Sequence, residues 1–116
     1  MNVTAVVWGI PNCDTVKGMR TALAQAGWVV DFRDFKKLGV PQDRLPGWAA
    51  AVGWERLLNR QGTTWKKLEP AVQAAAADAA GAAALMAAQP SVVKRPVIEW
   101  PDGRITVGKV AVSPPA

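Results

Sequence analysis

The sequence predicts an α/β fold with a four-stranded mixed sheet, and three observations lead to this prediction. An apolar run at residues 3–8 is followed by a helical pattern and by a second β-type run at 28–35. A long helical block comes next. Two short β-type runs, at 97–100 and 105–107, then flank a turn. A strand, a helix and a second strand form a βαβ unit with parallel strands and a right-handed crossover. The hairpin completes a mixed sheet covered by helices.

The elements of the βαβ unit follow from residue spacing. The valine-rich run at 3–8 is almost continuously apolar, which is typical of a buried parallel strand. The spacing of Val16, Met19 and Leu23 places these side chains on one face of a helix. Gly27 is the kind of residue that ends a helix. The first strand and the helix are therefore joined by a turn at residues 9–14.

The middle of the chain is predicted to be a helical insertion at about 41–89 within a single domain spanning residues 1–116. Pro46 and the glycine after it are expected to break the first helix of this block. Pro70 occupies a position that tolerates proline in a first turn, and it opens an alanine-rich stretch. Gly81 is expected to divide that stretch in two. The hairpin after the block turns at a Pro-Asp-Gly sequence.

Composition limits the chemistry of the chain. It has 116 residues, half of them hydrophobic, with one cysteine, no histidine and a net charge of +5. A single cysteine cannot form an internal disulfide, and the lack of histidine excludes Cys-His and Ser-His catalysis. No structural zinc site or other metal is expected. The cations are scattered and match no nucleic-acid motif, so they are assigned to solvated surface.

The start of the chain and its apolar runs predict where the protein works. We find no signal peptide at the N-terminus and no apolar run of the roughly 18 residues that a membrane span needs. A lone cysteine also fits a reducing compartment. The expectation is a cytoplasmic monomer that contacts neither membrane nor nucleic acid.

Cys13 is the candidate reactive residue. It lies where the first strand leads into the first helix, and the unpaired N–H groups and dipole of a helix start stabilise an anion. A thiolate at such a place has a lowered pKa and is nucleophilic. Asp14 opposes this effect, and it could instead be the N-cap of the helix. Since residue 16 is valine, the second thiol has to come from glutathione or from a partner protein.

The chain resembles the Spx/arsenate reductase family, and in particular its YffB-like branch. The matching segments follow the family order along nearly the whole chain: GIPNCDTVK at 9–17, DFKK at 34–37, GWERLLNR at 53–60, GTTWKKL at 62–68 and KRPV at 94–97. The resemblance implies a thioredoxin-like fold with a helical insertion, a nucleophilic Cys13 and a cis peptide bond before Pro96. It also implies a glutathione-dependent thiol reductase with glutathione as co-substrate.

The resemblance and the residue types together give the expected site. Cys13 and Arg95 are the catalytic candidates, because an arginine beside Pro96 could pair with a thiolate, a carboxylate or an oxyanion. The candidates for binding the substrate or glutathione are Asn12, Thr15, Arg60 and Pro96. For Thr15, either a hydroxyl contact to the sulfur or a capping role is open. For Arg60, a solvated helix end is an equal alternative.

Two other functions remain open. Arsenate reductases hold the oxyanion with three arginines. Arg95 matches one of them, whereas this chain has Asn59 followed by Arg60 at the second position and Gly108 near the third. A mixed disulfide is therefore the preferred substrate over arsenate, with a glutaredoxin-like protein as a further partner. The other alternative is an RNA polymerase-binding regulator like Spx. The family's closing helix has no counterpart in the proline-rich segment at 108–116.

Overall fold

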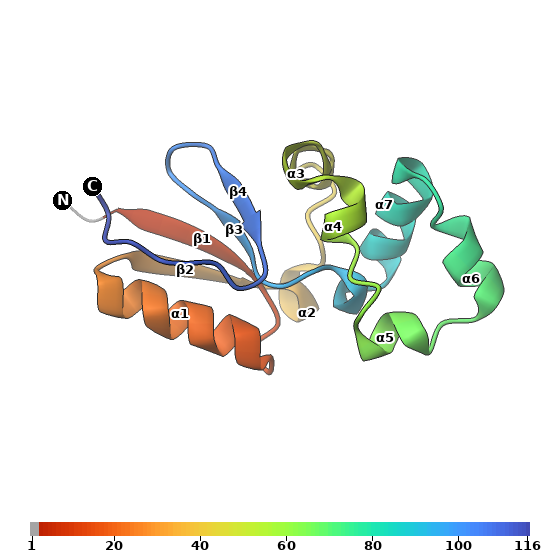
Figure 1. The fold of residues 1–116 in the computed structure, drawn as a ribbon, viewed down its shortest axis with the longest axis horizontal. Helices are drawn as coiled ribbons and strands as arrows, with labels where there is room; N and C mark the ends of the chain where they lie inside the picture. Colours follow the sequence, from red (N-terminus) through yellow and green to blue (C-terminus); the bar gives the residue numbers. More distant parts are fainter. Residues whose placement is uncertain (1–2) are drawn as a thin grey trace. The chain divides into compact units, whose positions relative to one another are not determined.

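The computed structural model describes residues 3–116 and contains the expected sequence of elements (Figure 1). The strands are β1 (Thr4–Gly9), β2 (Val29–Asp34), β3 (Val97–Glu99) and β4 (Ile105–Val107). The helices are α1 (Asp14–Ala26), α2 (Phe35–Leu38), α3 (Leu45–Val52), α4 (Trp54–Leu57), α5 (Thr63–Lys66), α6 (Pro70–Ala75) and α7 (Ala79–Ala88), followed by the 3-10 turn η1 (Pro90–Val92).

The chain forms two compact units. The sheet unit comprises the residues up to Lys37 together with Arg95–Ala116, and the helical unit comprises Leu38–Lys94. The helical block expected at about 41–89 falls within the helical unit. That the 116 residues work as one domain stays a prediction.

The sheet unit confirms the predicted four-stranded mixed sheet. Its strand order is β2-β1-β3-β4, so β2 and β4 are the two edges. β1 pairs in parallel with β2 and antiparallel with β3, which in turn pairs antiparallel with β4. Val7 in the centre of β1 is aligned with Phe32 of β2 and with Ile98 of β3. This is the arrangement that a βαβ unit followed by a hairpin predicts.

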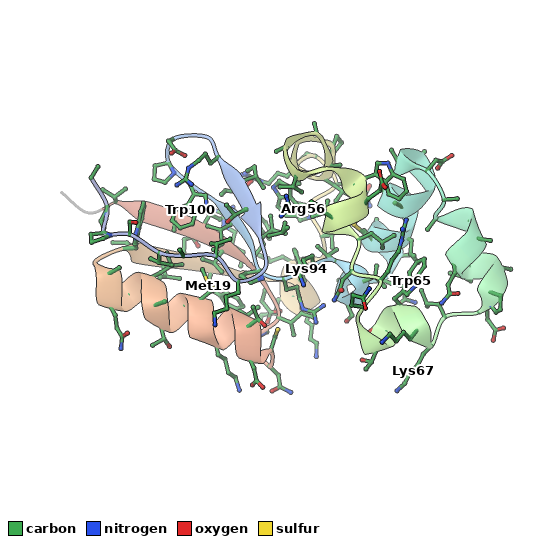
Figure 2. All side chains as sticks on the ribbon, in the orientation of Figure 1. Met19, Arg56, Trp65, Lys67, Lys94 and Trp100 are labelled. Atoms are coloured by element: carbon green, nitrogen blue, oxygen red, sulfur yellow. The ribbon has the colours of Figure 1, made fainter. Side chains whose placement is uncertain are left out.

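The core of the sheet unit lies between α1 and the sheet. Met19 and Leu23 of α1 pack with apolar side chains of β1 and β3 and with Trp100, and Val110 and Val112 of the C-terminal segment pack against this core. Met19 and Trp100 are labelled in Figure 2. The helix ends at Gly27, whose φ of 102° lies in the left-handed region that glycine adopts at little cost. The spacing that predicted α1 therefore also identified its buried face.

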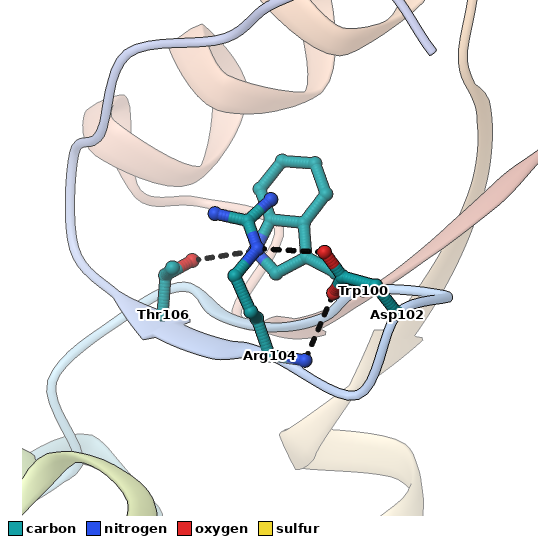
Figure 3. A network of polar contacts seen from close by, with 4 residues as sticks. All are labelled: Trp100, Asp102, Arg104 and Thr106. Atoms are coloured by element: carbon teal, nitrogen blue, oxygen red, sulfur yellow. Dashed lines mark hydrogen bonds and ion pairs between the residues drawn. The ribbon is translucent and has the colours of Figure 1, made fainter. Parts of the chain in front are cut away.

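The hairpin that joins β3 to β4 is closed by a local polar network (Figure 3). Trp100 donates its indole N–H to the hydroxyl of Thr106 at 3.0 Å, and its backbone N–H bonds to the carbonyl of Arg104. Asp102 accepts bonds from the backbone N–H of Arg104 at 3.0 Å and from its Nε at 2.9 Å. These contacts, from the backbone N–H and then the guanidinium, lower the pKa of Asp102. The turn predicted at Pro-Asp-Gly is thus present.

The C-terminal segment after β4 contains no helix among the described residues. It runs beside the edge of the core, where the indole N–H of Trp28 donates to the carbonyl of Ser113 at 2.8 Å. Trp28 also meets Trp100 edge to face, with the ring centroids 5.1 Å apart. Across residues 3–116, no helix combines the length and the apolar character that crossing a bilayer demands.

The helical unit corrects two expectations. Pro46 does not break a helix, because α3 begins at Leu45 and the proline lies in its first turn, where its missing N–H has no intrahelical partner to lose. The alanine-rich stretch does divide, but before Gly81. α6 ends at Ala75, and Asp78 then caps α7 by accepting a bond from the N–H of Gly81 at 2.7 Å. Gly81 itself lies inside α7.

The packing of α7 nevertheless requires glycine at position 81. The stability change that we predict for Gly81→Ala is therefore opposite in sign to the one that helix propensity gives. A Cβ at this position would collide with the backbone carbonyl of Ala75. Gly81→Ala is therefore expected to destabilise the protein by about 1–3 kcal/mol, as overpacking does, although alanine is the better helix former by about 1 kcal/mol. Urea unfolding checks this. Gly47→Ala is the matched control, since a Cβ there meets nothing within 4 Å, and equal stability of the two variants would contradict the prediction.

Candidate active site

Cys13 occupies the N-cap of α1, with extended backbone angles (φ −142°, ψ 122°). The sequence left Asp14 open as the cap, and this was wrong, because Asp14 is the first residue of the helix. Gly9 at the end of β1 lies close to the first turn of this helix. A Cβ on Gly9 would lie 2.9 Å from Cγ2 of Val16, so only glycine lets the first turn of α1 approach the strand so closely.

The surroundings of Cys13 favour its thiolate. Partial burial raises the pKa of the thiol, but the backbone N–H of Val16, the side chain and positive charge of Arg95, and the backbone N–H of Thr15 together outweigh it. The net result lowers the pKa of Cys13 below its ordinary value. The Cys13 side chain makes no capping hydrogen bond to α1, so these N–H groups act on the sulfur as the positive end of a helix acts on a nearby anion.

Arg95 and Pro96 lie directly before β3, in the same unit as Cys13. The peptide bond between them is cis, as the family resemblance implied. Pro96 is fully buried, and its carbonyl accepts a bond from the N–H of Gly108 at 2.9 Å, which ties the segment after β4 to the start of β3. The side chain of Arg95, the residue before this buried proline, interacts with the sulfur of Cys13. The two catalytic candidates are therefore brought together.

The other candidates are placed differently. Asn12 is exposed in the turn directly before Cys13. Thr15 helps to lower the pKa of the Cys13 thiol through its backbone N–H, whereas the sequence had pointed to its hydroxyl or to a capping role. Arg60 belongs to the helical unit, and its guanidinium carbon lies 5.5 Å from the ring centre of Trp54 and 5.9 Å from that of Trp65. Its assignment to the substrate site stays a prediction.

Comparison with known proteins identifies the family. The model of the ArsC family matches residues 8–111, which include Cys13, Arg95 and Pro96. The chain belongs to the ArsC family. An uncharacterized protein of Haemophilus influenzae is 33% identical over 102 residues, which cover 88% of each chain.

Two solved structures resemble this ArsC-family chain along most of its length. The YFFB protein has a TM-score of 0.85 and 45% sequence identity, with 91% of each chain covered. An arsenate reductase (ArsC) related protein from Brucella melitensis has a TM-score of 0.75 and 44% identity, covering 95% of this chain and 90% of its own. The resemblance seen in the sequence motifs, including that to the YffB-like branch, is therefore confirmed, and so is the thioredoxin-like fold.

Sequence reasoning missed the role of Val16 in this ArsC-family site. Val16 was assigned only to the buried face of α1, yet its N–H is the largest single contribution that lowers the pKa of the thiol. Its position in the first turn of α1, three residues after the N-cap, is the signal that could have identified it, since the N–H groups of a first turn have no partner within the helix and favour an anion beside them. Within residues 3–116, no group of three or more Cys, Asp or Glu side chains is placed to hold a metal ion.

The pKa of Cys13 leads to a prediction about its reactivity. The rate of alkylation by iodoacetamide against pH is expected to show a midpoint below the ordinary value of about 8.5. Arg95→Ala should move the midpoint upward, because the thiolate loses both a hydrogen bond and a charge while the two amide donors remain. Arg104→Ala, which removes an exposed guanidinium in the hairpin, is the control. An unchanged midpoint in Arg95→Ala would show that the arginine does not stabilise the thiolate.

The same shift links the thiol to stability. Because the pKa is lowered in the folded protein, the thiolate stabilises the fold at pH values above the pKa of an unfolded cysteine. This contribution is lost as the pH falls through the folded-state pKa.

Proposed function

We propose that the protein is a glutathione-dependent thiol reductase that works through Cys13. The observation that carries the proposal is the stabilised thiolate of Cys13, held by the first-turn amides of α1 and by Arg95. Membership of the ArsC family supports a thiol-based oxidoreductase. Glutathione enters because the chain contains one cysteine and therefore has no second thiol of its own.

The reaction has two thiol exchange steps. The Cys13 thiolate attacks the glutathionyl sulfur of a mixed disulfide, so that a Cys13–glutathione disulfide forms and the substrate thiolate leaves and takes up a proton. A second glutathione thiolate then attacks the glutathionyl sulfur of this adduct, which releases glutathione disulfide and restores the Cys13 thiolate. In the net reaction, the mixed disulfide and one glutathione thiol become the free substrate thiol and glutathione disulfide, so the second glutathione supplies the reducing equivalents. Arg95 would stabilise the thiolate of Cys13 each time it forms.

Arsenate is the less suitable substrate, because the chain lacks two of the three arginines that arsenate reductases use. A tetrahedral oxyanion needs several converging donors to offset its desolvation. At the two other arginine positions of arsenate reductases, this chain has Asn59, whose side chain accepts from the N–H of Gln61, and Gly108, whose φ is 74°. A residue with a side chain would be strained at that φ, so the backbone disfavours an arginine at Gly108 itself.

A parallel assay of two substrates tests the proposal. The mixed disulfide of glutathione and 2-mercaptoethanol and arsenate are offered separately at equal concentration with excess glutathione, and glutathione disulfide is measured through glutathione reductase. We expect turnover of the mixed disulfide and little of arsenate. Turnover of arsenate alone would make the protein an oxyanion reductase. No turnover of either, with Cys13 still open to alkylation, would favour the Spx-like binding role, which capture of RNA polymerase from a lysate would then examine.

A further inference from the structure

A pocket opens beside the start of α1, within the sheet unit. Its volume is about 430 Å³, in the range of small-ligand sites. Its lining combines the first three turns of α1 with the segment after β4: Asp14, Thr15, Gly18, Met19, Ala22, Lys109, Val110 and Val112. Asp14 and Thr15 directly follow Cys13 in the chain, so one end of the pocket lies at the same end of α1 as the reactive residue. We call it the Asp14–Lys109 pocket.

The pocket has two charges of opposite sign on an apolar floor. Asp14 and Lys109 are both exposed to solvent, and Met19, Ala22 and the two valines are apolar. The backbone directly before Lys109 is anchored, since the N–H of Gly108 bonds to the carbonyl of Pro96. A ligand that suits this lining carries a carboxylate and an ammonium group close together, with a short methylene chain behind them.

We propose that the Asp14–Lys109 pocket binds the amino-acid end of the γ-glutamyl group of glutathione. Lys109 contacts the α-carboxylate, Asp14 contacts the α-ammonium group, and the two methylenes lie on the apolar floor. This inference rests on the proposed function and adds the part of the tripeptide that the pocket selects. The charged end of the γ-glutamyl group is separated from the reacting cysteine of glutathione by an amide and two methylenes, a reach of about 7 Å, or roughly two extended residues. The pocket lining starts at Asp14 and Thr15, at the same end of α1 as Cys13.

The test measures binding of unreactive analogues, so it does not depend on turnover. The probes are S-methylglutathione and S-methyl-N-acetyl-cysteinyl-glycine, which keeps the cysteine and glycine but lacks the γ-glutamyl group. We expect the protein to bind the first at least about tenfold more tightly, as a contact with a charged group implies. Lys109→Ala and Asp14→Asn should each remove most of this preference without changing affinity for the second probe.

Controls separate the pocket from general charge. Lys37→Ala removes an exposed lysine outside the pocket and should keep the preference. Equal affinity of the wild type for both probes, binding of neither, or an equal loss for both probes in Lys109→Ala would overturn the inference. Selective binding without any turnover of the mixed disulfide would instead contradict the proposed reductase function and leave the pocket established.

Discussion

Cys13→Ser is expected to lower turnover of the glutathione mixed disulfide by more than about a thousandfold, as loss of a nucleophile does in other enzymes. The hydroxyl is not ionised at neutral pH, so the amides of Val16 and Thr15 and the Arg95 side chain would have no thiolate to stabilise. The chain has no other cysteine to replace it. The coupled assay with glutathione reductase gives the rate, corrected for the reaction of glutathione alone.

The fold should survive this change. Serine is a preferred N-cap residue, and its oxygen can accept from the same first-turn amides. A melting curve close to that of the wild type would therefore show that the lost rate belongs to the chemistry. If Cys13→Ser retained a substantial part of the activity, Cys13 would not be the nucleophile, and the proposed mechanism would fail.

Trp48→Ala should produce the largest loss of stability. Trp48 lies in α3 with 1% of its surface exposed and is among the largest fully buried side chains of the described residues. Replacing such a buried aromatic side chain by alanine typically lowers the free energy of unfolding by about 3–5 kcal/mol. The whole free energy of unfolding of a domain is only about 5–15 kcal/mol. The melting temperature is expected to fall by roughly 10–20 °C. Thermal unfolding followed by far-UV circular dichroism measures this.

Val72→Ala provides the comparison for this variant. Val72 lies in α6 of the same helical unit but is 39% exposed, so its removal should change stability by less than about 0.5 kcal/mol. Equal melting temperatures for the two variants would mean that the helical unit does not depend on packing around Trp48.

Residue spacing was sufficient to predict the sheet unit. The apolar run of β1, the face of α1 and the stop at Gly27 are all local signals, and the order of elements then determines the sheet topology. The helical unit was harder, because its helices are short and their breaks depend on packing. Asp78 separates the two alanine-rich helices, because its side chain forms the capping bond that starts α7. The sequence instead predicted the break at Gly81, because glycine is a poor helix former.

The site could be predicted in part for a similar reason. Cys13 was identifiable from its place between a strand and a helix. The cap was not, because propensity ranks aspartate among the best N-caps, whereas Asp14 is already the first residue of α1 and Cys13 is its N-cap. The contact between Arg95 and Cys13 joins distant parts of the chain, and only the family resemblance pointed to it. The opposite charges of the Asp14–Lys109 pocket are likewise far apart in sequence.

The two edges of the sheet bear on how the protein avoids aggregation. An open edge presents unpaired backbone groups to which a strand of another molecule can add. β4 has only three residues, so little ladder could form there. β2 has six, but Asp31, Arg33 and Asp34 place charges along it, and Arg33 pairs with Asp31 at 3.0 Å. A strand added to β2 would have to strip water from these charges. The short length of β4 and the charged side chains of β2 therefore disfavour the addition of strands from other molecules to either edge of the sheet.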